Sequence, residues 1–141
     1  MNFLSSQSKL FAGLLCLMLI TVEYGGHFLL SILKGTIPGY SAASPQFPFF
    51  RAGHAHAAVW IILGLVAQPL IDATQGSDGI KLLMRILFVA SPLLISGGFF
   101  AGAPTMADGK PGALHRLIYA GLATLTGALV LLGVNLIRHR G

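Results

Sequence analysis

The sequence predicts an all-α integral membrane protein whose four spans form an up-down-up-down four-helix bundle. Hydrophobic residues make up 55% of the 141 residues and charged residues only 9%, whereas a soluble domain carries about 25% charged residues. The few charges border four apolar segments, each close to the ~20 residues that a helix needs to cross the hydrocarbon core. Two of the three connections are short, which favours antiparallel neighbours.

The first span is expected at about 10–33, and its only charge is Glu23. It lacks a small-x-small cleavage site and continues past Val22, so we interpret it as retained rather than as a signal peptide. Three further spans are expected at about 53–71, 86–107 and 115–137. We predict helices because each backbone polar group must be satisfied inside the membrane. The whole chain, 1–141, is then one four-span domain.

The connections and the basic residues predict an orientation. Residues 34–50 form the longest connection, rich in proline, glycine and serine, while 72–79 and 103–113 are short. With the N-terminus inside, five lysine and arginine residues lie on the cytoplasmic side and four on the other. This bias and the "RHR" tail at 138–140 favour cytoplasmic termini in a multi-pass cell-membrane protein.

Four histidines fall at the same membrane face under this topology. They are His27 in the first span, His54 and His56 in the second, and His115 at the start of the fourth; His139 falls at the other face. The orientation puts the four at the periplasmic or outer face. Ionisable groups inside the membrane are costly and usually pair within the bundle. For Glu23 we expect His27, His54 or His56 as partner, with Arg51 or Arg116 reaching in from the boundary.

The motif "RAGHAHAAVW" sharpens this prediction. On a regular helix His54 and His56 point about 200° apart, so only one faces inward; if the helix starts near Ala55, both can converge. "GG" at 25–26 leaves room for a neighbouring helix or a flat ligand. Pro92 is expected to kink the third span. Small residues indicate close helix packing in the third and fourth spans, at Gly98, Gly102, Gly121, Gly127 and Gly133.

Neutral imidazole suits heme iron and copper. Two histidines from neighbouring helices could hold heme axially, with Arg51 and Arg116 near its propionates, or two or three could converge on copper. The metal-ligand candidates are His27, His54, His56, His115 and Glu23. An i, i+4 histidine pair of the kind found in zinc hydrolases is lacking, and no serine or cysteine stands beside a base. The sequence therefore favours a binding protein over an enzyme.

Residues 53–65, "GHAHAAVWIILGL", resemble the histidine-bearing membrane helix of heme-copper oxidase catalytic subunits. They are also similar to small bacterial four-helix membrane proteins in which His-x-His opens a span. The resemblance implies His54 or His56 as a heme ligand. The remaining copper-binding histidines of the oxidases are missing, so it implies heme or metal binding rather than oxidase activity.

Two other hypotheses stay open beside heme or copper binding for electron transfer or for assisting a membrane complex. One is a small transporter or proton-relay protein that uses Glu23 and the histidines. The other is a structural subunit whose small-residue faces dock partner helices in a homo-oligomer or a larger complex. The basic residues are dispersed rather than interleaved with aromatic side chains, which excludes nucleic acid and leaves the lipid bilayer as the expected environment.

Overall fold

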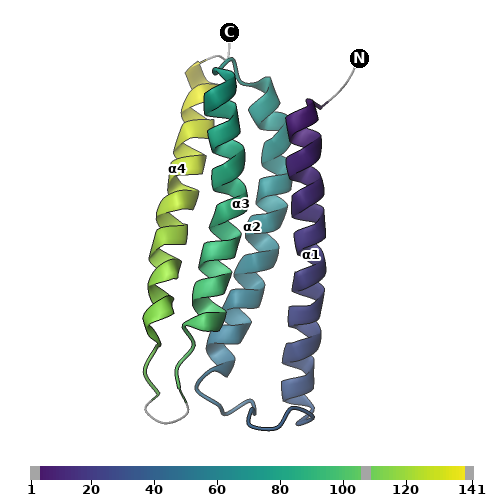
Figure 1. Ribbon diagram of the computed structural model, residues 1–141, viewed down its shortest axis with the longest axis vertical. Coiled ribbons are helices and arrows are strands. Elements are labelled where there is room, and N and C mark those ends of the chain that lie inside the picture. The colour runs from purple at the N-terminus through teal and green to yellow at the C-terminus, as the bar shows by residue number, and fades with distance from the viewer. Residues whose placement is uncertain (1–3, 106–108, 139–141) are drawn as a thin grey trace.

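The computed structural model describes residues 4–105 and 109–138, and these residues form four long helices and one short 3₁₀ helix (Figure 1). The elements are α1 (Ser6–Leu33), α2 (Phe47–Ala73), α3 (Asp78–Ala101), η1 (Ala113–Arg116) and α4 (Leu117–Arg138). Each of the four spans is long and apolar enough to cross a membrane. The predicted all-α, four-span architecture is confirmed. Residues 106–107 of the third predicted span, and His139 and Arg140, lie outside the described residues.

The helices extend beyond the charges that were used to delimit the spans. α2 already begins at Phe47, with Pro48 in its first turn, where a missing N–H costs no hydrogen bond. α3 begins at Asp78 because the Ser77 hydroxyl accepts a hydrogen bond from the Ile80 N–H. Lysine and arginine are good helix formers, so a charge at the edge of an apolar segment does not end the helix.

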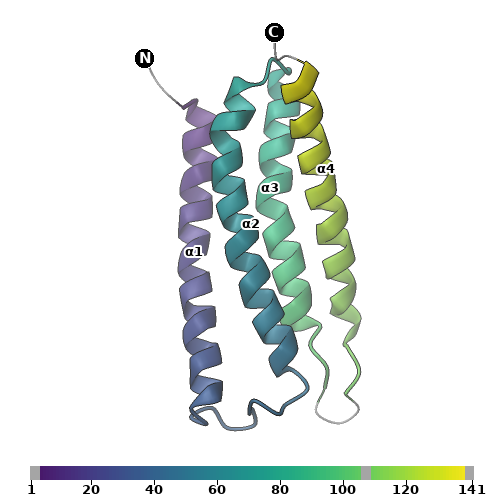
Figure 2. The ribbon, with the colours of Figure 1, turned by 180° about the vertical axis from the view of Figure 1, so that it is seen from behind.

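The four helices lie side by side in chain order, and both termini are at the same end (Figures 1 and 2). α1 packs on α2, α2 on α3 and α3 on α4, while the described residues of α1 and α4 do not touch. This order confirms the up-down-up-down topology. We call the end with Ser6, Ala73, Asp78 and Arg138 the terminal end. The end with Leu33, Phe47, Ala101 and Leu117 is the histidine end.

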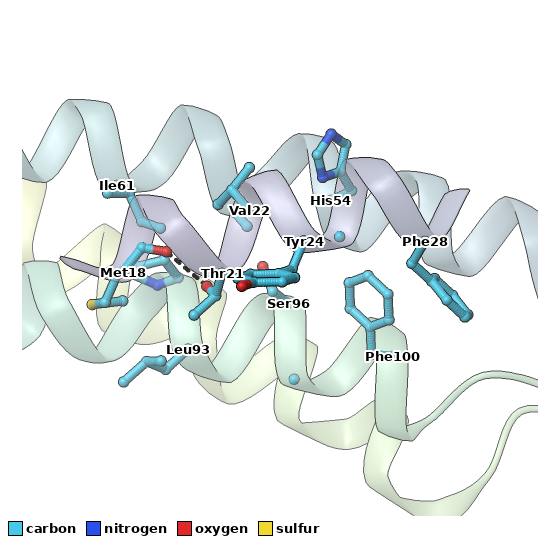
Figure 3. A pocket seen from close by; sticks show the side chains of 14 residues that line it. Met18, Thr21, Val22, Tyr24, Phe28, His54, Ile61, Leu93, Ser96 and Phe100 are labelled. Atoms are coloured by element: carbon cyan, nitrogen blue, oxygen red, sulfur yellow. Dashed lines mark hydrogen bonds between the residues drawn. The ribbon is translucent and has the colours of Figure 1, made fainter. Parts of the chain in front are cut away.

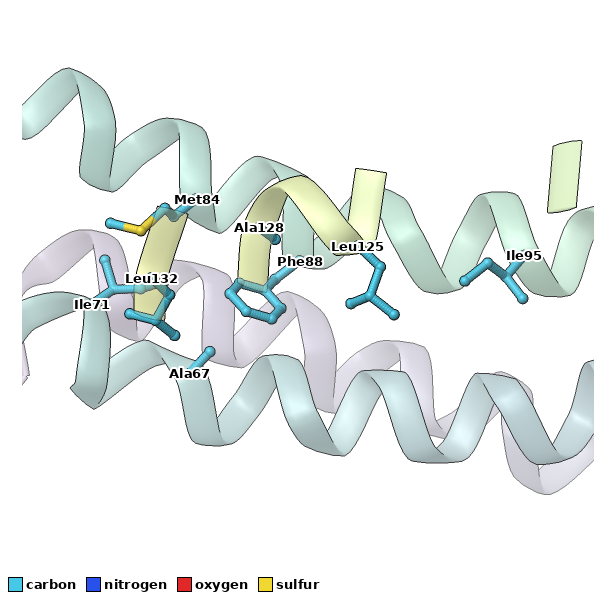
Figure 4. Close-up of a cluster of buried hydrophobic side chains, with 8 residues drawn as sticks. All are labelled: Ala67, Ile71, Met84, Phe88, Ile95, Leu125, Ala128 and Leu132. Carbon is cyan, nitrogen blue, oxygen red and sulfur yellow. The ribbon is translucent and has the colours of Figure 1, made fainter. Parts of the chain in front are cut away.

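Two apolar clusters hold the row together. The larger joins α2, α3 and α4 (Figure 4) and consists of Ala67, Ile71, Met84, Phe88, Ile95, Leu125, Ala128 and Leu132. The smaller joins α1 to the start of α2 and consists of Leu29, Ile32, Phe47 and Phe50. α1 is the least buried span, with 17% of its most apolar 18-residue window inside the protein against 39% for α3. One side of α1 is therefore left without a helix beside it.

Small residues bring α3 and α4 close together, as the sequence predicts for Gly98, Gly102 and Gly121. A Cβ at Gly121 would lie 2.8 Å from the Ile95 backbone nitrogen, and one at Gly98 would lie 2.7 Å from that of Ile118. A Cβ at Gly102 would overlap the His115 backbone. Gly127 and Gly133 differ, because a Cβ at Gly127 would make only an ordinary contact and one at Gly133 would meet nothing within 4 Å. Gly133 therefore makes no close helix contact among the described residues.

Pro92 lies inside α3, where it removes the N–H that would bond the carbonyl of Phe88. Gly64 of α2 faces this freed carbonyl, since a Cβ at Gly64 would lie 3.6 Å from the Phe88 oxygen. The small residue lets α2 approach the irregular turn of α3 closely. The kink expected at Pro92 stays a prediction.

Candidate functional site

The four histidines lie toward the histidine end but do not converge. His27 is exposed on α1, whereas His54, His56 and His115 are half-buried on α2 and η1. Among the described residues, no group of three or more histidine, cysteine, aspartate or glutamate side chains could hold a metal ion. The common topology therefore places the histidines at one end without assembling them into one cluster.

His54 lies at the interface between α2 and α1, against the Gly25–Gly26 pair. A Cβ at Gly25 would lie 3.2 Å from His54 Nδ1, and one at Gly26 would lie 3.3 Å from His54 Cε1. The room that the glycines leave is thus taken by this imidazole. His54 Nδ1 is buried and has no hydrogen-bond partner among the described residues. A buried polar atom without a partner is rare in native proteins and calls for an explanation.

His56 lies on a different side of α2, facing α3. Its ring stacks on Phe99, with the ring centroids 5.1 Å apart. His56 Nδ1 is 2.7 Å from the carbonyl oxygen of Ala52, and because a carbonyl only accepts, Nδ1 carries the proton in the neutral ring. The predicted divergence of His54 and His56 is confirmed, but the expectation that only one of them faces inward is wrong, since both are half-buried against neighbouring helices. The alternative in which the helix starts near Ala55 is wrong, since α2 starts at Phe47.

His115 belongs to η1 and also bonds locally. Its Nδ1 donates to the Gly112 carbonyl over 2.8 Å, and its ring meets Tyr119 edge to face with centroids 6.0 Å apart. The phenol of Tyr119 and the imidazole of His115 thus lie on the same face. Arg116 is exposed beside it. Neither His115 nor Arg116 lines the pocket between α1, α2 and α3 that is described below.

Glu23 and His27 lie exposed on α1, one turn apart. They line a hollow of about 440 Å³ on the helix surface with Ile20 and Tyr24. The only ion pair among the described residues lies elsewhere, and no hydrogen bond joins Glu23 to any of them. His54, which was expected as a partner, lies on the α2 side of α1. The expectation that Glu23 pairs within the bundle is therefore wrong for the described part of the chain.

A pocket of about 520 Å³ opens between α1, α2 and α3. Figure 3 shows His54 at its α2 wall, with Tyr24 and Phe28 from α1 and Phe100 from α3. Two of the polar groups in the wall bond to backbone, Thr21 Oγ1 to the Met18 carbonyl and Ser96 Oγ to the Gly53 carbonyl, while His54 Nδ1 has no partner among the described residues. An apolar pocket of this size with few polar groups is typical of a small-molecule site.

Arg51 lies one turn before His54 and lines a second hollow with it, of about 510 Å³, between α1 and α2. The guanidinium carbon of Arg51 is 5.9 Å from the centroid of the Phe47 ring, and the side chain is otherwise exposed. His54 thus separates an apolar pocket from a hollow that carries a positive charge. Arg51, unlike Arg116, lies beside the histidine that borders the apolar pocket.

A polar cluster at the terminal end was missed by the sequence reasoning, which took Asp72 and Arg85 as span boundaries. Arg85 is 1% exposed and forms an ion pair with Asp72. It also donates to Ser8 Oγ over 3.0 Å and to Gln7 Oε1 over 3.2 Å. The Ser5 N–H donates to Asp72 over 2.9 Å, so the cluster ties together α1, α2 and α3. The short loop between Asp72 and Arg85 was the available signal, because it brings both charges to one end.

No family model, curated protein or solved structure matches this chain. The resemblance of residues 53–65 to the oxidase helix therefore stays a prediction from the sequence.

Proposed function

We propose that this multi-pass membrane protein binds heme in the pocket between α1, α2 and α3, with His54 as the axial ligand. The observation that carries the proposal is the buried, unpartnered ring nitrogen of His54 at the wall of an apolar pocket. Imidazole is a common protein ligand of heme iron. The rings of Tyr24, Phe28 and Phe100 in the pocket wall suit a flat apolar macrocycle.

Arg51 supports the same assignment from the membrane boundary. Heme carries two carboxylates, and an arginine one turn from the axial ligand could pair with them. Among the residues that the structure describes, His54 is the only histidine in the pocket wall. This favours one axial protein ligand rather than the clamp of two histidines considered from the sequence. We propose that such a heme would serve electron transfer or assist a membrane complex.

The geometry lends less support to the other assignments. Copper would need two or three converging histidines, whereas His54, His56 and His115 each have a different immediate environment. A proton relay from Glu23 would need a polar path between the two ends. Leu15 and Ile61, both essentially inaccessible, occupy the interior between His54 and the polar cluster of Arg85 and Asp72 at the terminal end. Such apolar side chains do not carry protons.

The absorption spectrum of the purified protein tests the proposal. We expect a Soret band after expression with a heme supply, or after titration of the protein in detergent with hemin. His54→Ala should remove the band, while His56→Ala and His115→Ala should retain it. Gly97 provides a second test, because it lines the pocket and a Cβ added there meets nothing within 4 Å. Gly97→Leu should fill the pocket and remove the band while His54 stays intact.

Empty micelles titrated with hemin give the reference for non-specific uptake. Protein that adds nothing to that reference would refute the proposal. It would equally be refuted if His54→Ala and Gly97→Leu both kept the full band.

A further inference from the structure

A row of exposed residues runs along the whole length of α1 on the side away from α2. The row follows the alternating four- and three-residue spacing of a coiled-coil seam, and all its members are exposed: Lys9, Gly13, Cys16, Ile20, Glu23, His27 and Leu30. The residues that α1 buries are different ones, Ser8, Leu15, Leu29 and Ile32. We call the exposed row the Glu23 seam.

The seam carries ionisable groups deep in the membrane. At 1.5 Å rise per residue, Glu23 lies roughly 5 Å and His27 roughly 11 Å from the midpoint of α1. Both depths fall within the hydrocarbon core, whose half-thickness is about 15 Å. A charged or polar side chain that faces lipid at this depth is costly, and the described residues offer Glu23 no partner.

We propose that a second copy of this chain covers the seam, so that two α1 helices pair in parallel about a two-fold axis along the membrane normal. The seam is self-complementary because it holds one acid and one base a single turn apart. In such a parallel pair, Glu23 of one copy and His27 of the other lie one turn, about 6 Å, apart along the helix axis, so their side chains can meet diagonally across the interface. The paired seams would enclose two carboxylates and two imidazoles, each able to hydrogen-bond across the interface.

The small residues of the seam also favour pairing with the α1 helix of a second copy. Gly13 and Cys16 stand one turn apart in the terminal half of α1, and a Cβ at Gly13 would meet nothing within 4 Å. Small side chains at such positions let two membrane helices approach closely. Thr21 and Tyr24, which line the pocket, lie outside the seam. Tyr24 also borders the hollow beside Glu23 and His27, but no residue of the seam itself lines the pocket. Dimerisation and ligand binding can therefore be tested separately.

Disulfide cross-linking in liposomes tests the proposal, because a disulfide requires the two Cα atoms to lie within about 7 Å. Cys16 is the only cysteine of the chain and is exposed on the seam. Oxidation of the native protein should give a covalent dimer, and Cys16→Ser should remove it. In the Cys16→Ser background, Gly13→Cys and Ile20→Cys should restore the dimer. Leu14→Cys, Leu17→Cys and Thr21→Cys, exposed but off the seam, should not.

A second measurement removes the polar groups without removing the helix. Association of the Glu23→Leu/His27→Leu variant, followed by energy transfer between labelled copies in liposomes, should weaken about three- to thirtyfold. Thr21→Val is the matched control, because that hydroxyl bonds within α1 to Met18 and its loss should leave association unchanged.

Equal cross-linking at seam and off-seam positions would overturn the proposal, as would a protein that is monomeric in liposomes. The second outcome would assign the seam to a different protein. Neither outcome would bear on heme binding, since the Soret band reports the pocket alone.

Discussion

The two ends of the helix row treat their polar side chains in opposite ways. At the terminal end, Arg85 is buried and its terminal nitrogens are bonded to groups from α1 and α2, so that only its Nε lacks a partner among the described residues. At the histidine end, His54 Nδ1 is buried without a partner, and Glu23 is exposed on a membrane helix. A polar group that is satisfied within the chain stabilises the fold. For His54 and Glu23 we propose that the missing partner is a ligand in one case and a second chain in the other.

The largest expected effect tests the terminal end. Arg85→Ala should lower the free energy of unfolding by about 3 kcal/mol, because it removes the hydrogen bonds of a buried guanidinium to Ser8 and Gln7 and leaves the half-buried Asp72 without its counter-ion. Arg116→Ala is the matched control at the histidine end, and its cost should stay within about 0.5 kcal/mol since Arg116 is exposed. Unfolding of the purified protein in mixed detergent micelles measures both. Equal losses for the two variants would contradict the contrast between the ends.

A smaller effect is expected when a glycine packed between two helices is compared with a glycine on the exposed side of α1. Gly121→Leu should cost about 1–3 kcal/mol of stability, because its side chain would press into the Ile95 backbone of α3. Gly13→Leu should leave stability nearly unchanged, since the space beside Gly13 in the single chain is open. It should instead weaken the proposed pairing of α1 helices. The same unfolding assay, run beside the cross-linking assay, distinguishes the two results; a fold weakened equally by both variants would count against an open seam.

The fold was predictable from composition and the spacing of charges, whereas much of the site was not. Apolar segment length decides how many helices cross the membrane, and short loops decide their order. The directions of side chains depend on helix rotation, which the sequence leaves open for a helix exposed on one side. Periodicity did separate His54 from His56, but it did not reveal that Glu23 faces away from them. Arg85 was missed because a charge at a span edge usually faces water, and only the packing of α1 buries it.

The smallest expected effect is an increase in the free energy of unfolding, and it concerns His54. In the ligand-free protein, His54→Leu should raise the free energy of unfolding by up to about 1 kcal/mol, since it removes a buried ring nitrogen that has no hydrogen bond. His56→Leu should instead lower it by about 1 kcal/mol, because the bond to the Ala52 carbonyl and the stacking on Phe99 are lost. Unfolding curves of the two variants, recorded without heme, give the signs. A stabilised His54→Leu protein that no longer takes up heme would show that this histidine is kept for its ligand at the expense of the fold. If both variants were destabilised alike, His54 would be an ordinary packing residue.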